Sequence, residues 1–416
     1  MHQPVESSDC HGYAQYAGGP AGEGSELTSL AAVGGSFEPG SHEAPSQEAP
    51  SQEPQADDGQ STRAELDRLL TSLVELGGSD LHLTAGIAPC MRINGALARI
   101  PGCDKLTPLD TELLVRSFLP AVQWDRFEAT HELDTSYSVP GMSRFRVNVY
   151  RQRGSVGVAF RAIPHKIQSL AELGLPLVVE DFGRLPRGLV LVTGPTGSGK
   201  STTLASLLDL INDTRSGHIM TIEDPIEFIH THKKCVVNQR EVGSDTVDFA
   251  TALRHALRED PDIILVGELR DYETTSVAVT AAETGHLVLA TLHTQSAAQT
   301  IDRLIDIYPA HQQQQIRTQL SNCLQAVVTQ ALVPRSDNGG RTVVCEVMIA
   351  TPAIRNLIRE DRAHQISSFL QSSGELGMTS FDQDLAKRYN EHMISRNTAL
   401  GLAHDPNEFT RLTKGA

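Results

Sequence analysis

The stretch GPTGSGKS at residues 194–201 limits the possible folds of this chain more than any other feature. It fits the pattern G-x-x-x-x-G-K-[ST], it follows the apolar run LVLV, and it precedes the helical pattern STTLASLLDLIN. A strand, a glycine-rich loop and a helix in this order form a phosphate-binding loop, in which backbone N–H groups and a helix amino terminus face the phosphates. Further apolar runs alternate with helical stretches, so the sequence predicts an α/β fold with a mostly parallel sheet covered by helices.

The residue types in this loop predict a nucleotide-binding site. Lys200 can neutralise the β- and γ-phosphates of ATP, and the hydroxyl of Ser201 is a ligand for Mg²⁺. We therefore expect ATP and Mg²⁺ as cofactors. The residues predicted to contact the nucleotide are Gly194, Pro195, Thr196, Gly197, Ser198, Gly199, Lys200, Ser201 and Thr202.

Two acids are expected beside the phosphates because each follows an apolar run that predicts a core strand. Glu223 follows IMTI, and Glu268 follows DIILVG in the position of a Walker B acid. The carboxyl ends of parallel strands form the ligand-binding edge of an α/β sheet. Glu268 is expected to hold Mg²⁺ directly or through its water shell. Glu223 is expected to face the metal or the attacking water, and the alternative is a helix N-cap or a solvated loop acid.

Two histidines, His286 and His293, flank the apolar run LVLATL of another predicted strand. His293 follows the carboxyl end of this strand, so it is placed to contact a γ-phosphate and to report its loss. His286 lies at the start of the strand; it is also expected among the nucleotide-binding residues, and the alternative is a packed or surface histidine.

Composition and periodicity predict the boundaries of the parts of the chain. Residues 1–60 contain ten acidic residues and no Lys or Arg, and they are rich in Gly, Pro, Ser and Gln, which predicts a disordered acidic tail. Residues 61–164 alternate short strands with helical patterns, as in a small α+β domain. Residues 165–345 are predicted to form the ATPase core, residues 346–400 a helical region, and residues 401–416 a flexible C-terminus.

Charge and cysteine usage exclude several classes of function. The net charge is −16, and without the acidic tail the rest carries only −6, so no nucleic-acid partner is expected. The six cysteines contain no C-x-x-C pair, so we expect no zinc site and a reduced, cytoplasmic protein. No apolar run approaches the roughly 20 residues that span a bilayer, and the first residues lack the charge and apolar pattern of a signal peptide, so we expect neither a membrane span nor a secretion signal.

The chain resembles the secretion ATPase superfamily because GPTGSGKS, TIEDPIEF, ILVGELRD and TGHLVLATLHT occur in this order. The segments KKCVVNQREVG and AIRNLIRE are similar in particular to the PilT-type ATPases that retract type IV pili. The resemblance covers residues from about 64 to 400. It implies a PAS-like N-terminal domain, a RecA-like P-loop ATPase domain and a C-terminal helical part. It also implies a homohexameric motor in the cytoplasm, at the inner-membrane base of the pilus machine, with a platform protein and related pilus ATPases as partners.

The same resemblance implies roles for individual residues. Glu223 matches the acid that orients or deprotonates the attacking water, and the two histidines match the His box of the family. AIRNLIRE matches a motif linked to retraction, and ordinary core packing is the alternative for its apolar residues. The arginines that match residues directed toward the nucleotide are Arg144, Arg146 and Arg161, with a solvated strand face as the alternative.

Several alternatives stay open within and beyond the superfamily. The segment SSGELGMTSFDQDLAKRYNEHMIS is also similar to PilU, the accessory retraction paralogue, and a type II or type IV secretion motor is a further alternative. The missing tetracysteine zinc motif argues against a pilus extension ATPase. A regulatory module that hydrolyses little ATP is disfavoured by the presence of Lys200, Glu223 and Glu268, and a DNA translocase is disfavoured by the charge.

Overall fold

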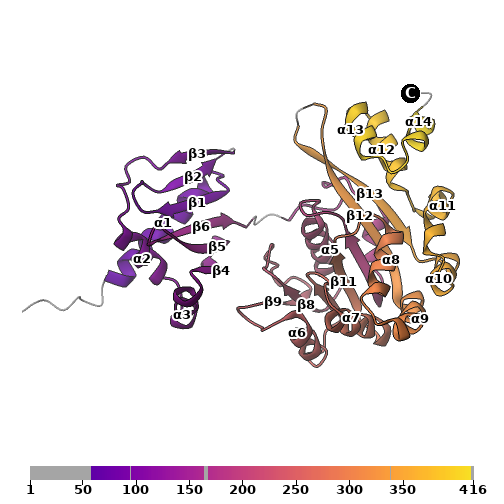
Figure 1. Cartoon of the computed structure of the whole chain (residues 1–416), viewed down its shortest axis with the longest axis horizontal. Coiled ribbons are helices and arrows are strands. Elements are labelled where there is room, and N and C mark those ends of the chain that lie inside the picture. Colours follow the sequence, from indigo (N-terminus) through magenta and orange to yellow (C-terminus); the bar gives the residue numbers. More distant parts are fainter. Residues whose placement is uncertain (1–57, 94, 164–166, 338, 414–416) are drawn as a thin grey trace, which may run out of the picture. The chain divides into compact units, whose positions relative to one another are not determined.

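The computed structural model describes residues 58–93, 95–163, 167–337 and 339–413 (Figure 1). The predicted acidic tail, apart from its last three residues, and the predicted boundary at residue 164 lie outside these ranges. Helix α1 (Asp58–Glu75) begins three residues before the predicted start of the first domain. Among the described residues, no helix combines the length and the apolar character needed to cross a bilayer.

The described residues between 58 and 163, called the first domain here, combine helices with six antiparallel strands in the order β3-β2-β1-β6-β5-β4. Helices α1 and α2 (Pro108–Arg116) pack on one face of this sheet, where alternate strand residues such as Leu81, Val147 and Phe160 are buried. Helix α3 (Ala121–Thr130) precedes β4. The strands are β1 (Asp80–Thr84), β2 (Cys90–Ile93), β3 (Ala96–Arg99), β4 (Glu132–Val139), β5 (Ser143–Gln152) and β6 (Ser155–Ala162).

The described residues between 167 and 413, called the second domain here, contain a seven-stranded sheet in the order β13-β12-β7-β11-β10-β8-β9. Its strands pair in parallel from β12 to β9, and β13 pairs antiparallel with β12, so the predicted mostly parallel sheet is confirmed. The strands are β7 (Gly188–Thr193), β8 (Gly217–Glu223), β9 (Cys235–Glu241), β10 (Ile263–Val266), β11 (Leu287–Leu292), β12 (Leu324–Pro334) and β13 (Arg341–Ile349).

Helices cover both faces of this sheet, which explains why its central strands are apolar without alternation. Every residue of β7, β10 and β11 is buried. One face packs against α4 (Val178–Phe182) and α5 (Lys200–Thr214). The helices on the other face are α6 (Phe249–Ala256), α7 (Tyr272–Thr284), α8 (Ala297–Asp306), α9 (Gln313–Cys323), α10 (Pro352–Arg359) and α11 (Ile366–Gln371).

The predicted boundary at residue 346 is wrong, because it falls inside β13. This strand continues to Ile349, which pairs with Ala326 of β12, since the two strands form one long antiparallel hairpin. The predicted flexible C-terminus is also folded in its described part. Helices α13 (Arg396–Leu402) and α14 (Pro406–Thr413) continue the helical region, and Phe409 of α14 is fully buried in a cluster with α12 (Phe381–Asn390).

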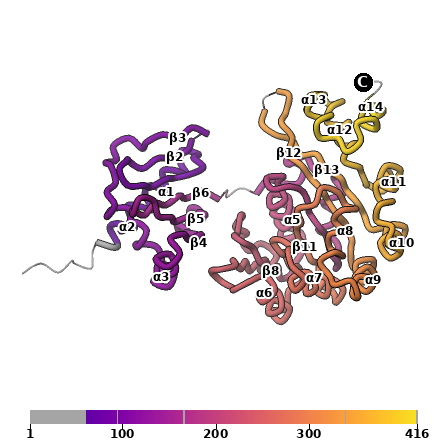
Figure 2. Tube along the Cα trace, in the orientation of Figure 1, coloured from indigo at the N-terminus to yellow at the C-terminus, as the bar shows by residue number. Residues whose placement is uncertain are grey.

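Helices α12 to α14 gather beside the β12–β13 hairpin (Figure 2). Two buried carboxylates add polar contacts to this packing. Asp384 of α12 accepts the backbone N–H of Cys345 in β13 at 2.9 Å. Glu346 of β13 accepts the backbone N–H of Ala297, the first residue of α8, at 2.7 Å, and burial raises the pKa of Glu346 to about 7. Strand β13 therefore connects the C-terminal helices with the helix that follows His293.

Candidate nucleotide-binding site

The loop between β7 and α5 adopts the backbone conformation that its glycines allow. Gly194, Gly197 and Gly199 have φ values of 137°, 79° and 91°, which side-chain-bearing residues rarely adopt. A Cβ atom at Gly194 would lie 2.2 Å from the carbonyl oxygen of Gln330 in β12. The side-chain Nε2 of Gln330 donates a hydrogen bond to the carbonyl of Ser198 at 2.8 Å. Strand β12 therefore supports the loop at both of these points.

Lys200, the first residue of α5, folds back along the loop. Its Nζ donates to the carbonyl oxygens of Gly194 at 2.9 Å and Pro195 at 3.2 Å, and it lies 3.5 Å from Nδ1 of His293. Burial lowers the pKa of Lys200, and the nearby carboxylates of Glu268 and Glu227 oppose this effect. When a nucleotide binds, its phosphate oxygens can replace these carbonyl oxygens as acceptors for Nζ of Lys200.

A cavity of about 610 Å³ opens at this loop and at the carboxyl ends of the neighbouring strands. Its position agrees with the rule that α/β proteins bind ligands at this edge of the sheet. The structure thus brings together residues from both domains that the sequence had predicted as site residues. Those that line the cavity are Thr196, Gly197, Gly199, Lys200, Ser201, Thr202, Glu223, Glu268, His293 and Arg146.

The two predicted acids lie at the ends of adjacent parallel strands, but their surroundings differ. Glu268, two residues after β10, forms an ion pair with Arg270, and its Oε2 lies 3.4 Å from Nε2 of His293. Glu223, the last residue of β8, accepts hydrogen bonds from neutral side chains, and burial raises its pKa. The two carboxylates are therefore suited to different tasks at the same cavity.

Two oxygen ligands in this cavity fit a magnesium ion. The hydroxyl of Ser201 and the carboxylate of Glu268 both line it, and Mg²⁺ prefers hard oxygen ligands of these types. Both residues come from positions that follow a strand of the same parallel sheet. Coordination of Mg²⁺ by these two residues stays a prediction.

Four predicted nucleotide contacts do not line the cavity. Gly194, Pro195 and Ser198 support the loop through the backbone contacts described above. His286 lies at the amino end of β11, and its Nδ1 is 3.0 Å from the carbonyl oxygen of Ala281 near the end of α7. Six strand residues at about 3.3 Å each separate it from the edge where His293 lies, so the structure does not bring His286 to this site.

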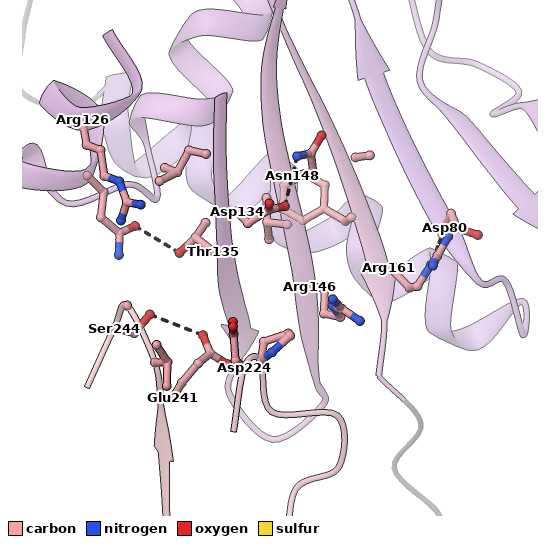
Figure 3. A pocket seen from close by; sticks show the side chains of 18 of the residues that line it. Asp80, Arg126, Asp134, Thr135, Arg146, Asn148, Arg161, Asp224, Glu241 and Ser244 are labelled. Carbon is pink, nitrogen blue, oxygen red and sulfur yellow. Dashed lines mark hydrogen bonds and ion pairs between the residues drawn. The ribbon is translucent and has the colours of Figure 1, made fainter. Parts of the chain in front are cut away.

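The three predicted arginines have different partners. Arg144 donates to Glu241 at 3.0 Å, whereas Arg146 pairs with Glu227 at 3.4 Å. Arg161 lies on β6, next to the strand of Arg146. It pairs with Asp80 at 2.8 Å, and Figure 3 shows these two side chains beside each other. Of the three, Arg146 is the one that lines the cavity at the phosphate-binding loop.

Several residues of the cavity wall were missed by the sequence analysis. Leu332 and Arg341 come from the two strands of the β12–β13 hairpin, and Glu227, His230 and Arg270 are among the others. A signal for the hairpin was present, because the turn-forming stretch RSDNGG at residues 335–340 separates two apolar runs.

Comparisons with known proteins show the family to which this chain belongs. Residues 177–392 match the family described as Type II/IV secretion system protein. The chain is 51% identical over 348 residues to the type IV pilus retraction ATPase PilT of Pseudomonas aeruginosa, covering 83% of this chain and all of that protein. It is 42% identical to the type IV pilus ATPase PilU of the same organism, covering 84% of this chain and 91% of that protein.

A solved structure of the pilus retraction motor PilT with bound ADP is also similar to this chain. The TM-score is 0.78 at 48% identity, and the match covers 83% of this chain and 99% of that one. Because the family match covers more than half of the sequence and the similarity to PilT extends through both domains, the chain belongs to the type II/IV secretion system family, among its PilT-type ATPases.

Proposed function

We propose that this chain is a motor ATPase that couples ATP hydrolysis to type IV pilus retraction and so to twitching motility. The observation that carries the proposal is the convergence of Lys200, Glu223 and Glu268 on one cavity at the phosphate-binding loop. The names of its relatives supply the process that the hydrolysis drives.

The reaction follows from the chemistry of these side chains. Lys200 leaves the loop carbonyls and contacts the β- and γ-phosphates of ATP. Mg²⁺, held by Ser201 and Glu268 in part through water, would neutralise the charge that develops on the phosphates. Glu223 orients a water molecule and accepts its proton as the water oxygen bonds to the γ-phosphorus and the bond to the bridging oxygen of ADP breaks. His293, between Lys200 and Glu268, contacts the γ-phosphate and responds to its loss.

The motion proposed for the motor is a change in the placement of the first domain on the second. Arg146 belongs to the first domain and lines the cavity, so it can report the phosphates to its domain through a bidentate contact. Its partner Glu227 is only partly buried, which makes the ion pair easy to exchange for phosphate oxygens. We further propose that six copies form the working ring in the cytoplasm, bound to the pilus platform protein at the inner membrane.

The alternative roles within the family can be separated by complementation. We expect this chain to restore twitching to Pseudomonas aeruginosa that lacks PilT, because the identity to PilT exceeds that to PilU. The measurement is the diameter of the twitching zone, with the Glu223→Gln variant as the inactive control. Restoration in a strain that lacks PilU, and not in the one that lacks PilT, would assign the accessory role instead.

A second prediction concerns the arginines of the first domain. Arg146→Ala should lower kcat for ATP about tenfold or more, because a charge-assisted contact to the phosphates is lost in the transition state. Arg161→Ala is the matched control on the neighbouring strand, and its kcat should stay within about twofold since its guanidinium pairs with Asp80. Steady-state phosphate release measures both. Equal losses in the two variants would contradict the selection of Arg146.

A further inference from the structure

The carboxylate of Glu223 is held by two neutral side chains that reach the same oxygen. The hydroxyl of Thr221 donates to Oε1 at 2.7 Å, and Nε2 of Gln239 donates to Oε1 at 3.1 Å. Thr221 lies two residues earlier on β8, and so on the same side of the strand as Glu223. Gln239 lies on β9, directly across from Thr221 in the parallel register.

The amide of Gln239 can take only one orientation because of its other contacts. Its Oε1 accepts the backbone N–H of His230 at 2.8 Å, which requires the carbonyl oxygen of the amide at that position. The NH₂ group therefore points toward two acceptors, the carbonyl of Phe228 at 2.8 Å and the carboxylate of Glu223. Thr221 is fully buried, so its hydroxyl is also confined.

We propose that Gln239 and Thr221 are positioning residues for Glu223, which fix its Oε1 so that Oε2 faces the attacking water. The inference rests on the role of Glu223 in the proposed function. Neutral donors suit this task because they orient a carboxylate without placing a full positive charge beside it. Glu268, in contrast, is paired with the guanidinium of Arg270.

The first test removes each donor with little change in shape. Gln239→Met and Thr221→Val should each lower kcat about five- to tenfold, as expected for one lost hydrogen bond, while KM for ATP stays within about twofold. Thr221→Ser keeps a hydroxyl and should retain most of the turnover. Gln239 also forms hydrogen bonds with the loop at Phe228 and His230, whereas Thr221 does not support this loop. If both variants lose kcat by a similar factor, the loss comes from the missing contact with Glu223 and not from a loosened loop.

The second test places the same changes in a chain that already carries Glu223→Gln. A residue that acts through Glu223 should have no further effect there, so the rates of the double variants should equal that of Glu223→Gln alone. Single-turnover hydrolysis of radiolabelled ATP by the full chain measures these low rates. A loss by the same factor in both backgrounds, or unchanged kcat in both single variants, would overturn the proposal.

Failure of the underlying role of Glu223 gives a different result. If Glu223→Gln alone keeps full turnover, Glu223 does not act on the water, and the assignment of its positioning residues falls with it. If Glu223→Gln loses about 100-fold or more and retains nucleotide binding, the role holds and the double variants decide on Gln239 and Thr221.

Discussion

Replacing Lys200 by alanine is expected to lower ATP hydrolysis on the order of 10²- to 10³-fold, because the only cation on the phosphate-binding loop itself is removed. The amine is poised for this contact, since its present partners are two loop carbonyls and His293. Nucleotide binding should weaken as well, because the charge of the β- and γ-phosphates is no longer neutralised. Phosphate release across an ATP titration, with and without Mg²⁺, measures the effect.

Lys233→Ala is the matched control for this variant. Its Nζ pairs with Asp209 at 2.7 Å and Asp213 at 3.0 Å, in the same domain but away from the cavity lining. The control should hydrolyse ATP at nearly the rate of the unmodified chain. Comparable turnover in the Lys200 and Lys233 variants would mean that the loop does not bind the phosphates as proposed.

Gly194→Ala is expected to destabilise the second domain by about 3 kcal/mol or more, a cost typical of severe overlap in a packed core. The new Cβ would meet the carbonyl oxygen of Gln330 at 2.2 Å, and this oxygen belongs to the backbone of β12, which is paired on both sides, so it cannot turn away. The positive φ of 137° adds backbone strain. Urea unfolding followed by circular dichroism measures the change in the free energy of unfolding.

Gly197→Ala in the same loop separates strain from overlap. Gly197 has a φ of 79°, but nothing lies within 4 Å of a Cβ atom built there. We expect a loss of only about 1 kcal/mol from the left-handed conformation. If the two alanine variants unfold at the same urea concentration, the contact between Gly194 and Gln330 does not constrain the loop.

The contiguous parts of the site were predictable from the sequence, whereas the contacts between distant strands were not. The phosphate-binding loop depends on eight consecutive residues between a strand and a helix, so its pattern is local. Gln239 donates a hydrogen bond to Glu223, and Gln330 donates one to Ser198. These pairs lie together because β9 lies beside β8, and β12 beside β7, in the sheet. A sequence pattern does not determine which of several apolar strands pair, so these two amides gave no signal of their own.

The first-domain arginines show the same limit. Arg144 and Arg146 are two residues apart on β5, so they lie on one face of the strand. Arg144 pairs with Glu241 and Arg146 pairs with Glu227. Both acids belong to the other domain, so the spacing of the arginines carries no information about them. Strand alternation fixes the direction of a side chain, but not which group approaches it.

The segment AIRNLIRE illustrates how packing and a proposed functional motif can coincide. Ile354 and Ile358 are buried, as the packing alternative expected. Arg355 donates to the carbonyls of Ser321 and Asn322 at 2.8 and 2.9 Å, so it satisfies backbone groups at the end of α9. A loss of retraction on replacing Arg355 would therefore have to be compared with the stability of the variant.

Strand β13 lies at the edge of the central sheet, yet all its residues from Thr342 to Met348 are buried. The cover over Val333 and Val344 of the hairpin includes Phe381 and Phe409, which come later in the chain. During synthesis on the ribosome the hairpin thus emerges before its cover, and the edge stays open to pairing with other nascent chains until α14 has been translated. A premature stop codon after Ile349 would consequently produce an aggregation-prone product rather than a shorter motor.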